Sequence, residues 1–250
     1  MPQESRQGKA VIPLISAKEF LEGQGIDTGR YNLKKALLAF MSIAAMADRF
    51  KGETGSEPAL SHTYEHPLIR DDGTILVGQV YGGPYCSIVL EELAVSGVTC
   101  AVGYGFSGTL DSDVAPGSIM VAESSFCSDG TSKQYTRDRE VPSDPEMLES
   151  LQAIASSRGT ELEVGRVWTT DALYREFPSK VGYWKNRGAR FVNLETASFY
   201  AVARSVGIRV IYLSVVSDTL YRDKWSGWSP NLEDSVGRMW NIALAMIGGL

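Results

Sequence analysis

The chain has 250 residues, of which 44% are hydrophobic and 22% are charged, and it carries a formal net charge of −6. This composition is typical of a soluble globular protein with a full core, and the negative charge disfavours general nucleic-acid and anionic-membrane binders, because both need a basic surface. The longest apolar run, residues 36–47, is too short to cross a bilayer and no signal peptide opens the chain, so we expect a cytoplasmic protein.

Helical and extended segments alternate along the chain, which predicts a mostly parallel sheet covered by helices on both faces. No repeat, linker or break in composition divides the sequence, so we expect one domain over residues 1–250, with residues 1–8 frayed. Apolar periodicity and turn residues set the boundaries. The expected helices are 33–50, 86–95, 145–157, 178–186, 196–206 and 232–247, and the expected strands are 74–81, 99–105, 119–123, 163–169, 190–194 and 209–216.

A glycine-rich segment, GYGFSG at residues 103–108, follows the predicted strand 99–105. Open α/β sheets bind ligands beyond the carboxyl ends of their strands. Glycines there allow a ligand to approach the backbone and expose amides that bind oxyanions or hydroxyls. A tight crossover turn is the alternative, and for this segment alone it is the favoured interpretation.

Two acids, Glu195 and Asp218, stand at the ends of an apolar run. Glu195 begins the helix 196–206, where a carboxylate can accept hydrogen bonds from the two adjacent hydroxyls of a ribose or can simply stabilise the helix start. Asp218 follows the apolar strand 209–216, where partial desolvation would favour the protonated form and a general-acid role; a turn or N-cap aspartate is the alternative. The three segments together, in chain order, favour a binding site.

Other candidates are weaker. His62 and His66, in SHTYEH, lack a third ligand and precede Pro67, which breaks any helix, so we expect a surface or subunit-contact loop and no metal. Trp225 and Trp228 could form a lid over a planar base or cover the core. GYGFSG does not meet the dinucleotide pattern, so no such cofactor is expected. The cysteines are odd in number and unclustered, which indicates free thiols: Cys86, Cys100 and Cys127.

Five motifs, in order, resemble the nucleoside phosphorylase and nucleosidase superfamily, which holds the purine nucleoside and uridine phosphorylases. The resemblance implies an α/β domain with a mixed, mostly parallel, partly barrel-like sheet flanked by helices. The motifs are GGPYCSIVLEEL (82–93), GYGFSGTLDSDVAPGSIMV (103–121), SDGTSKQY (128–135), VWTTDALYRE (167–176), and VNLETASFYAVARSVGIRV (192–210) followed by VVSD (215–218).

The same resemblance implies cleavage of the N-glycosidic bond of a nucleoside or 5′-modified nucleoside, without a cofactor. It implies that Glu195 holds the ribose hydroxyls and that Asp218 assists the departing base. It places the substrate against further residues of the matching motifs: Asn193, Leu194, Ser217, Phe106, Ser107, Gly108, Leu173 and Tyr174.

The sequence departs from the family's phosphorylases where they bind phosphate. They begin with a "GDPxR"-type loop, which the segment 9–22 lacks, and they carry an arginine and a Ser/Thr at the positions of Gly103 and Phe106. Losing a guanidinium and a hydroxyl removes most of the charge that holds a phosphate dianion. Phosphate would therefore need other donors, such as Arg222, Lys224, Arg175 or a neighbouring subunit's arginine.

Water is the other nucleophile, as in the superfamily's nucleosidases, which also lack the phosphate arginine. Glu19 and Glu22 are the candidates for a group that activates it. Phosphorolysis and hydrolysis both stay open at this point. A nucleoside-binding protein without turnover is a further alternative, although a binding module has less need of the leaving-group acid Asp218. We expect no nucleic-acid or membrane partner. We also expect a homodimer or trimer of dimers, with the SHTYEH loop or residues 81–83 completing a neighbour's site.

Overall fold

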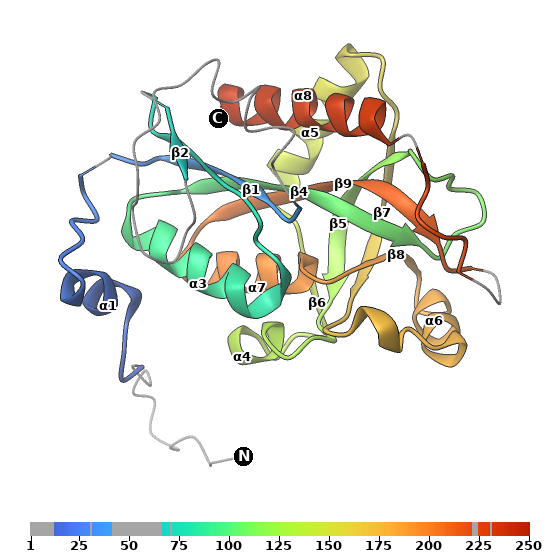
Figure 1. Cartoon of the computed structure of the whole chain (residues 1–250), viewed down its shortest axis with the longest axis horizontal. Helices are drawn as coiled ribbons and strands as arrows, with labels where there is room; N and C mark the ends of the chain where they lie inside the picture. Colours follow the sequence, from blue (N-terminus) through green and yellow to red (C-terminus); the bar gives the residue numbers. More distant parts are fainter. Residues whose placement is uncertain (1–12, 31, 42–66, 71, 222–224, 231) are drawn as a thin grey trace.

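Figure 1 shows the computed structural model of the chain, which describes residues 13–30, 32–41, 67–70, 72–221, 225–230 and 232–250. The strands are β1 (Lys35–Ala39), β2 (Leu68–Ile69), β3 (Thr74–Val77), β4 (Cys100–Thr109), β5 (Ile119–Phe126), β6 (Glu140–Pro142), β7 (Leu162–Thr169), β8 (Ala189–Asn193) and β9 (Arg209–Thr219). The helices are α1 (Ala17–Gly23), α3 (Gly82–Val95), α4 (Ser132–Tyr135), α5 (Pro145–Ser157), α6 (Pro178–Lys185), α7 (Thr196–Val206) and α8 (Glu233–Gly249), with a 3₁₀ turn η1 (Leu173–Arg175).

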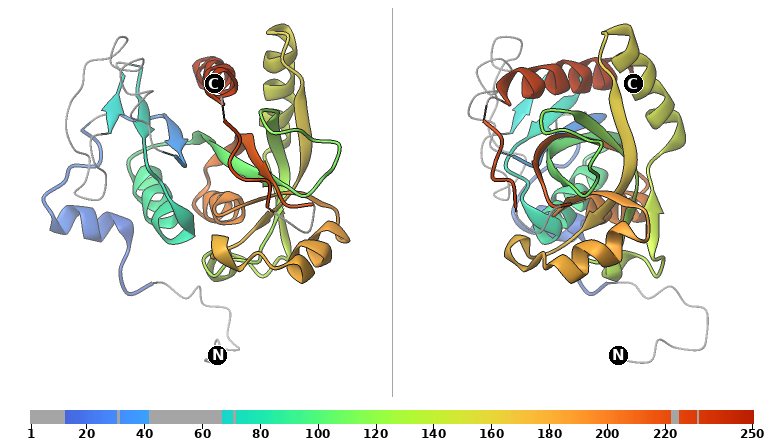
Figure 2. Two further views of the ribbon diagram at one scale, coloured as in Figure 1. Left: turned by 45° about the vertical axis from the view of Figure 1, so that its right-hand side comes forward. Right: turned by 90° about the vertical axis from the view of Figure 1, so that its right-hand side faces the viewer.

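The strands form one mixed sheet that curls and partly closes (Figure 2). The strand β9 runs parallel to β4 and antiparallel to β5. Because β5 also pairs with β7, β7 with β8, and β8 with β4, the pairing returns to its starting strand. The strands β1, β3 and β2 extend the sheet outwards from β4. The expected mixed, partly barrel-like sheet is confirmed.

Helices cover both faces of this sheet (Figure 1). The helices α3 and α7 pack together on one face, where Leu90 and Phe199 are buried in the first core cluster. The helices α5 and α8 lie on the opposite face, where Leu151 and Trp240 belong to a second cluster. The predicted boundaries of α5 and α7 are confirmed. Asp144 caps the start of α5, and Gly207 ends α7 in the left-handed conformation.

The helix predicted over residues 33–50 is wrong in its described part. Lys35–Ala39 is the strand β1, which lies between β3 and β4 and pairs in parallel with both. Its apolar residues are buried on both faces of the sheet, and a continuous apolar run of this kind cannot be told from a buried helix by periodicity. Residues 42–50 lie outside the described ranges, as do residues 1–8.

The turn predicted at GYGFSG is also wrong, because β4 continues through it to Thr109. A Cβ atom on Gly103 would lie 2.8 Å from the Phe199 ring, and one on Gly105 would lie 2.8 Å from the Tyr212 hydroxyl. These glycines let aromatic side chains lie directly against the strand. Likewise β9 continues through Asp218 rather than ending before it.

The described helices include none that is long and apolar enough to cross a membrane. The three cysteines are free thiols, as predicted. Burial raises the pKa of the Cys86 thiol well above its usual value, so this thiol is not activated for chemistry.

Candidate active site

A cavity of about 210 Å³ opens where β4, β8 and β9 meet the start of α7. It brings together both predicted catalytic acids and every predicted substrate-binding residue except Tyr174. Four of its lining residues, Phe40, Glu176, Val192 and Leu220, were not predicted, and Tyr81 had been expected only to complete a neighbour's site. The full lining is Phe40, Tyr81, Phe106, Ser107, Gly108, Leu173, Glu176, Val192, Asn193, Leu194, Glu195, Ser217, Asp218, Leu220 and Trp228.

Glu195 lies between β8 and α7 and is only 5% exposed. Its Oε1 accepts a hydrogen bond of 3.2 Å from the Gly82 amide, and its Oε2 accepts one of 3.1 Å from the Leu194 amide. Burial raises the pKa of this carboxyl to about 7, against the lowering effect of the two amides. A carboxylate has about four acceptor positions, so Glu195 keeps capacity for two hydroxyl groups.

Asn193, rather than Glu195, satisfies the start of α7. Its Oδ1 accepts from the amides of Glu195 and Thr196, while its Nδ2 donates to the Thr196 hydroxyl and to Ser107. Ser107 in turn accepts a 2.8 Å hydrogen bond from Ser214 of β9. This buried network joins β4, β8 and β9 beneath the cavity. Glu195 is therefore not needed as a helix cap, which weakens the alternative that this acid only stabilises the start of the helix.

Asp218 faces the cavity from within β9 and is half-buried. The Ser217 hydroxyl donates to its Oδ1 at 2.6 Å, and the Trp225 indole N–H donates to its Oδ2 at 2.9 Å. Both donors stabilise a carboxylate. The turn or N-cap role considered for this aspartate does not occur, since the strand runs on to Thr219. The prediction that Asp218 favours its protonated form considered only desolvation and did not include these two hydrogen-bond donors.

Glu176 is the functional candidate that sequence reasoning missed, although it ends the motif VWTTDALYRE. It follows the η1 turn and lines the cavity together with Asp218. Burial first, and then the negative charge of Asp218, raise the pKa of its carboxyl to about 7. Two candidates next to Glu176 in the sequence, Tyr174 and Arg175, do not line the cavity. Tyr174 is 93% exposed, and the Arg175 guanidinium lies 4.9 Å from the Phe177 ring, outside the cavity lining.

Aromatic rings lie around Gly103 and Phe106, the two positions at which the resemblance expects the family's phosphate donors. Phe106 packs edge-on against Trp228 with ring centroids 4.8 Å apart, and Phe40 packs edge-on against Phe199 at 5.4 Å. A Cβ atom on Gly103 would lie 2.8 Å from the Phe199 ring and 3.0 Å from the Phe40 ring, so an arginine cannot simply be restored there. No arginine or lysine lines the cavity within the described part of the chain. Arg222 and Lys224 lie outside that part.

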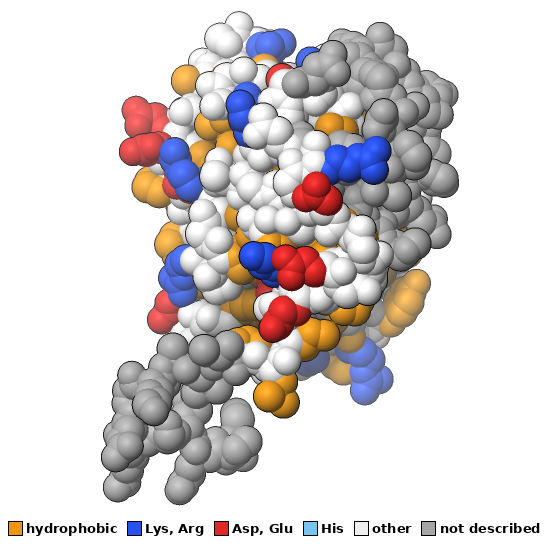
Figure 3. All heavy atoms as spheres, turned by 90° about the vertical axis from the view of Figure 1, so that its left-hand side faces the viewer, with side chains coloured by type: hydrophobic (Ala, Val, Ile, Leu, Met, Phe, Trp, Pro, Cys, Tyr) orange, Lys and Arg blue, Asp and Glu red, His pale blue; other side chains and the backbone are white. Residues whose placement is uncertain are grey.

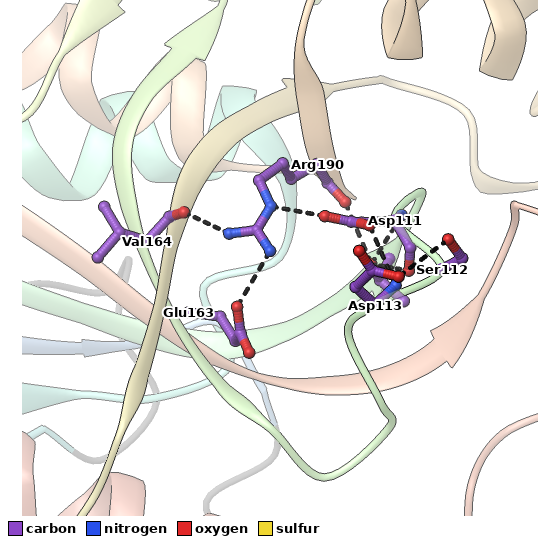
Figure 4. Close-up of polar contacts among 7 residues, drawn as sticks. Asp111, Ser112, Asp113, Glu163, Val164 and Arg190 are labelled. Carbon is purple, nitrogen blue, oxygen red and sulfur yellow. Dashed lines mark hydrogen bonds and ion pairs between the residues drawn. The ribbon is translucent and has the colours of Figure 1, made fainter.

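Arg190, close in sequence to the cavity residue Val192, is committed to a structural cluster (Figure 4). Its guanidinium donates to Asp111 at 2.8 Å, to Glu163 at 3.0 Å and to the Val164 carbonyl at 2.6 Å. These contacts tie the end of β4 to β7 and β8. Because two carboxylates neutralise its charge, Arg190 is not available to donate hydrogen bonds to a bound anion such as phosphate.

The two glutamates predicted to activate water lie elsewhere. On α1, Glu19 forms a capping box with Ser16, and Glu22 pairs with Lys18 at 3.8 Å. Neither lines the cavity, so the prediction is wrong for this structure. The segment SHTYEH lies outside the described residues. Within the described ranges, no group of three His, Cys, Asp or Glu side chains is placed to hold a metal ion.

Relatives share this sequence pattern over most of the chain. Residues 39–247 match the model of the family described as the Phosphorylase superfamily. An uncharacterised protein of Acanthamoeba polyphaga mimivirus is 35% identical over 164 residues, which are 65% of this chain and 63% of that protein. The guanosine phosphorylase of Halorubrum lacusprofundi is 29% identical over 177 residues, which are 68% of this chain and 73% of that enzyme. The match thus spans less than two thirds of the mimivirus protein's length.

The fold is shared with solved structures. The AMP nucleosidase from Bacteroides thetaiotaomicron superposes with a TM-score of 0.72 at 18% identity, covering 94% of this chain and 98% of that one. At this identity the likeness concerns the fold alone. The family match over residues 39–247 agrees with this fold and with the motifs that line the cavity. The chain belongs to the phosphorylase superfamily.

Proposed function

We propose that this protein cleaves the N-glycosidic bond of a purine nucleoside and that water, rather than phosphate, takes the ribosyl group. The observation that carries the proposal is one cavity with Glu195 and Asp218 in its wall, aromatic rings beside them and no cation in its described lining. The guanosine phosphorylase relative supports a purine nucleoside as the substrate class.

The two acids have separate tasks in this reaction. Glu195 accepts hydrogen bonds from the 2′- and 3′-hydroxyls and holds the ribose while its anomeric carbon gains positive charge. Asp218 gives a proton or a hydrogen bond to the base as the C1′–N bond breaks and the electron pair moves to the base. Protonating a leaving group in this way contributes about 10²–10⁴-fold to rate.

The aromatic wall of the cavity supports water rather than phosphate as the nucleophile. Burying a phosphate dianion without a cation costs several kcal/mol, and backbone amides offset only part of that cost. Phe40 and Phe106 supply no hydrogen-bond donor at all. A water molecule needs no counter-charge, so capture of the ribosyl cation by water is the step this cavity favours.

The test is product identity. The protein is incubated with a panel of purine and pyrimidine nucleosides, with and without saturating phosphate, and free base and sugar are measured. Free ribose at an unchanged rate in phosphate-free buffer supports hydrolysis. Ribose 1-phosphate as the main product contradicts it. No free base from any nucleoside favours the alternative of a binding protein without turnover.

Phosphorolysis is the second candidate, and the guanosine phosphorylase relative is the observation that favours it. It would require a relocated anion site, for which Arg222, Lys224 or a neighbouring subunit's arginine would have to supply the charge. Substituting Arg222 and Lys224 together by alanine should then raise the KM for phosphate. An unchanged KM for phosphate would leave a neighbouring subunit as the source.

A dimer, or a trimer of dimers, is the assembly we propose. Ile15 and Phe20 of the α1 region and Ile88 of α3 are exposed hydrophobic side chains around a shared hollow. Figure 3 shows the molecule from the side on which α1 lies in Figure 1, with hydrophobic side chains among the charged ones. Apolar patches of this kind mark contact surfaces. Tyr81 lines the cavity and is half-exposed, so a neighbour at this face would lie close to the site. A fully active monomer in sedimentation at micromolar concentration would contradict a shared site.

A further inference from the structure

The cavity contains a second carboxyl group beside the one that the proposed chemistry uses. Glu176, after η1, and Asp218, in β9, line the same cavity and interact electrostatically. Asp218 is held at both oxygens by Ser217 and Trp225. Glu176 has no such anchoring, because among the described residues nothing donates a hydrogen bond to its carboxyl group. It is therefore available to a ligand.

Two carboxyl groups in one partly dry site ionise together only at a cost, so below about pH 7 they hold one proton between them. Burial and the charge of Asp218 raise the pKa of Glu176 to about 7, whereas Asp218 accepts hydrogen bonds at both oxygens, from Ser217 and from Trp225. In the empty cavity the proton thus resides on Glu176. The other titratable groups in the described lining, Glu195 and Tyr81, add no positive charge that would change this balance.

A carboxyl pair with one proton offers one hydrogen-bond donor and one acceptor. Adenine presents the complementary pattern along one edge, with N7 as acceptor and the 6-amino group as donor. Guanine and hypoxanthine present two acceptors there, N7 and O6, and would need a proton on both carboxyl groups. The pair therefore distinguishes 6-amino from 6-oxo purines.

We propose that Glu176 is a specificity-determining residue which, paired with Asp218, selects 6-aminopurine nucleosides. The 6-amino group donates to Glu176 and stabilises its carboxylate, so the shared proton moves to Asp218, which faces N7. The proton then passes from Asp218 to N7 as the electron pair of the C1′–N9 bond moves into the base, and water attacks C1′ and returns a proton to Asp218. A 6-oxo group instead keeps the proton on Glu176, leaving a carboxylate opposite N7.

This inference rests on the proposed function, and the test separates the two. The kcat/KM of the wild-type protein is measured for adenosine, for purine riboside, which lacks a 6-substituent, and for inosine. We expect the order adenosine, purine riboside, inosine, with about 10- to 100-fold between the first and the last, the range that one correctly paired hydrogen bond supplies. Inosine cleaved as well as adenosine would overturn the inference while leaving the cleavage function intact.

Two variants sharpen the result. In Glu176→Gln, the amide both donates and accepts, so the adenosine-to-inosine ratio should fall to about threefold or less. Glu149→Gln, an exposed acid on α5, is the matched control and should keep the wild-type ratio. An unchanged ratio in Glu176→Gln would overturn the inference. If that variant does not fold, Glu176→Asp, which shortens the carboxyl arm, serves in its place with the same expected and contradicting results.

If the wild-type protein cleaves no nucleoside, the proposed function fails but the inference is still measurable. Calorimetric binding of adenosine and inosine then replaces turnover. Adenosine should bind more tightly than inosine by about 10-fold or more, and the difference should shrink in Glu176→Gln. Equal affinities, or tighter binding of inosine, would overturn the inference.

Discussion

Glu195 and Asp218 line one cavity, yet different parts of the protein hold them. Glu195 accepts hydrogen bonds from the backbone amides of Gly82 and Leu194, at the start of α3 and the end of β8. Asp218 accepts from the side chains of Ser217 and Trp225. Backbone donors are positioned by the fold, whereas side-chain donors exist only if the sequence supplies them. The proposed ribose end is therefore a property of the architecture, and the proposed base end is a property of this particular chain.

The largest expected effect comes from the side-chain-held acid. Asp218→Asn keeps an acceptor for the Trp225 N–H but cannot donate a proton, so kcat/KM on the best purine nucleoside should fall about 10²–10⁴-fold. The fold should be retained, with an unchanged melting temperature. A riboside with a nitrophenolate leaving group needs no protonation and should lose little. Wild-type turnover of purine nucleosides by this variant would remove Asp218 from the proposed role.

The backbone-held acid should show a smaller and more selective effect. Glu195→Gln should lower kcat/KM for ribonucleosides about 5- to 150-fold, because each lost hydrogen bond in a buried site costs about 1–3 kcal/mol. The corresponding 2′,3′-dideoxynucleosides should be nearly unaffected. Equal losses on both substrate types would exclude contact between Glu195 and the ribose hydroxyls.

The same acid predicts a pH dependence of binding. Burial raises the pKa of Glu195 to about 7, and its carboxylate form accepts both hydroxyls. The affinity for a ribonucleoside relative to its 2′,3′-dideoxy analogue should therefore rise as the pH goes from 6 to 8, since the carboxylate replaces the carboxylic acid. In Glu195→Gln this ratio of affinities should not change with pH.

The sequence predicts the backbone-held part of the molecule well. The boundaries of α5 and α7 follow from caps and periodicity, and the motif around Glu195 places that acid at the correct junction. Prediction fails where long-range pairing overrides local signals. The strand β1 resembles a helix because its apolar run is buried on both faces, and the glycines of β4 resemble a turn because the rings that pack on them are distant in sequence. Glu176 could not be identified, because its neighbour Asp218 is brought to it only by the fold.

Trp225 should contribute less than either acid. Its indole N–H orients one oxygen of Asp218, so Trp225→Phe should lower kcat about 10-fold with little change in KM, the cost of one hydrogen bond to a charged group. Trp225→His restores a ring N–H and should recover part of the loss. A change in KM alone, or an equal loss in both variants, would assign this 64%-exposed side chain to substrate contact rather than to positioning.

The smallest expected effect concerns stability, and it separates Glu176 from the well-anchored acids. Burial raises the pKa of Glu176 from its ordinary value of 4.5 to about 7, so the folded protein binds this proton more tightly than the unfolded chain does. The stabilisation is complete below about pH 4.5 and is lost as the pH rises through 7.

Glu176→Gln removes that loss and should raise the melting temperature at pH 8 relative to wild type, with little gain at pH 5. For a half-buried group screened by solvent, the gain is of the order of 1 kcal/mol, or about 2–4 °C in a chain of this size. Glu149→Gln, on the exposed side of α5, should show no such pH dependence. An equal gain at both pH values would mean that the charge of Glu176 is not destabilising in the folded protein, and the shared proton with Asp218 would lose its physical basis.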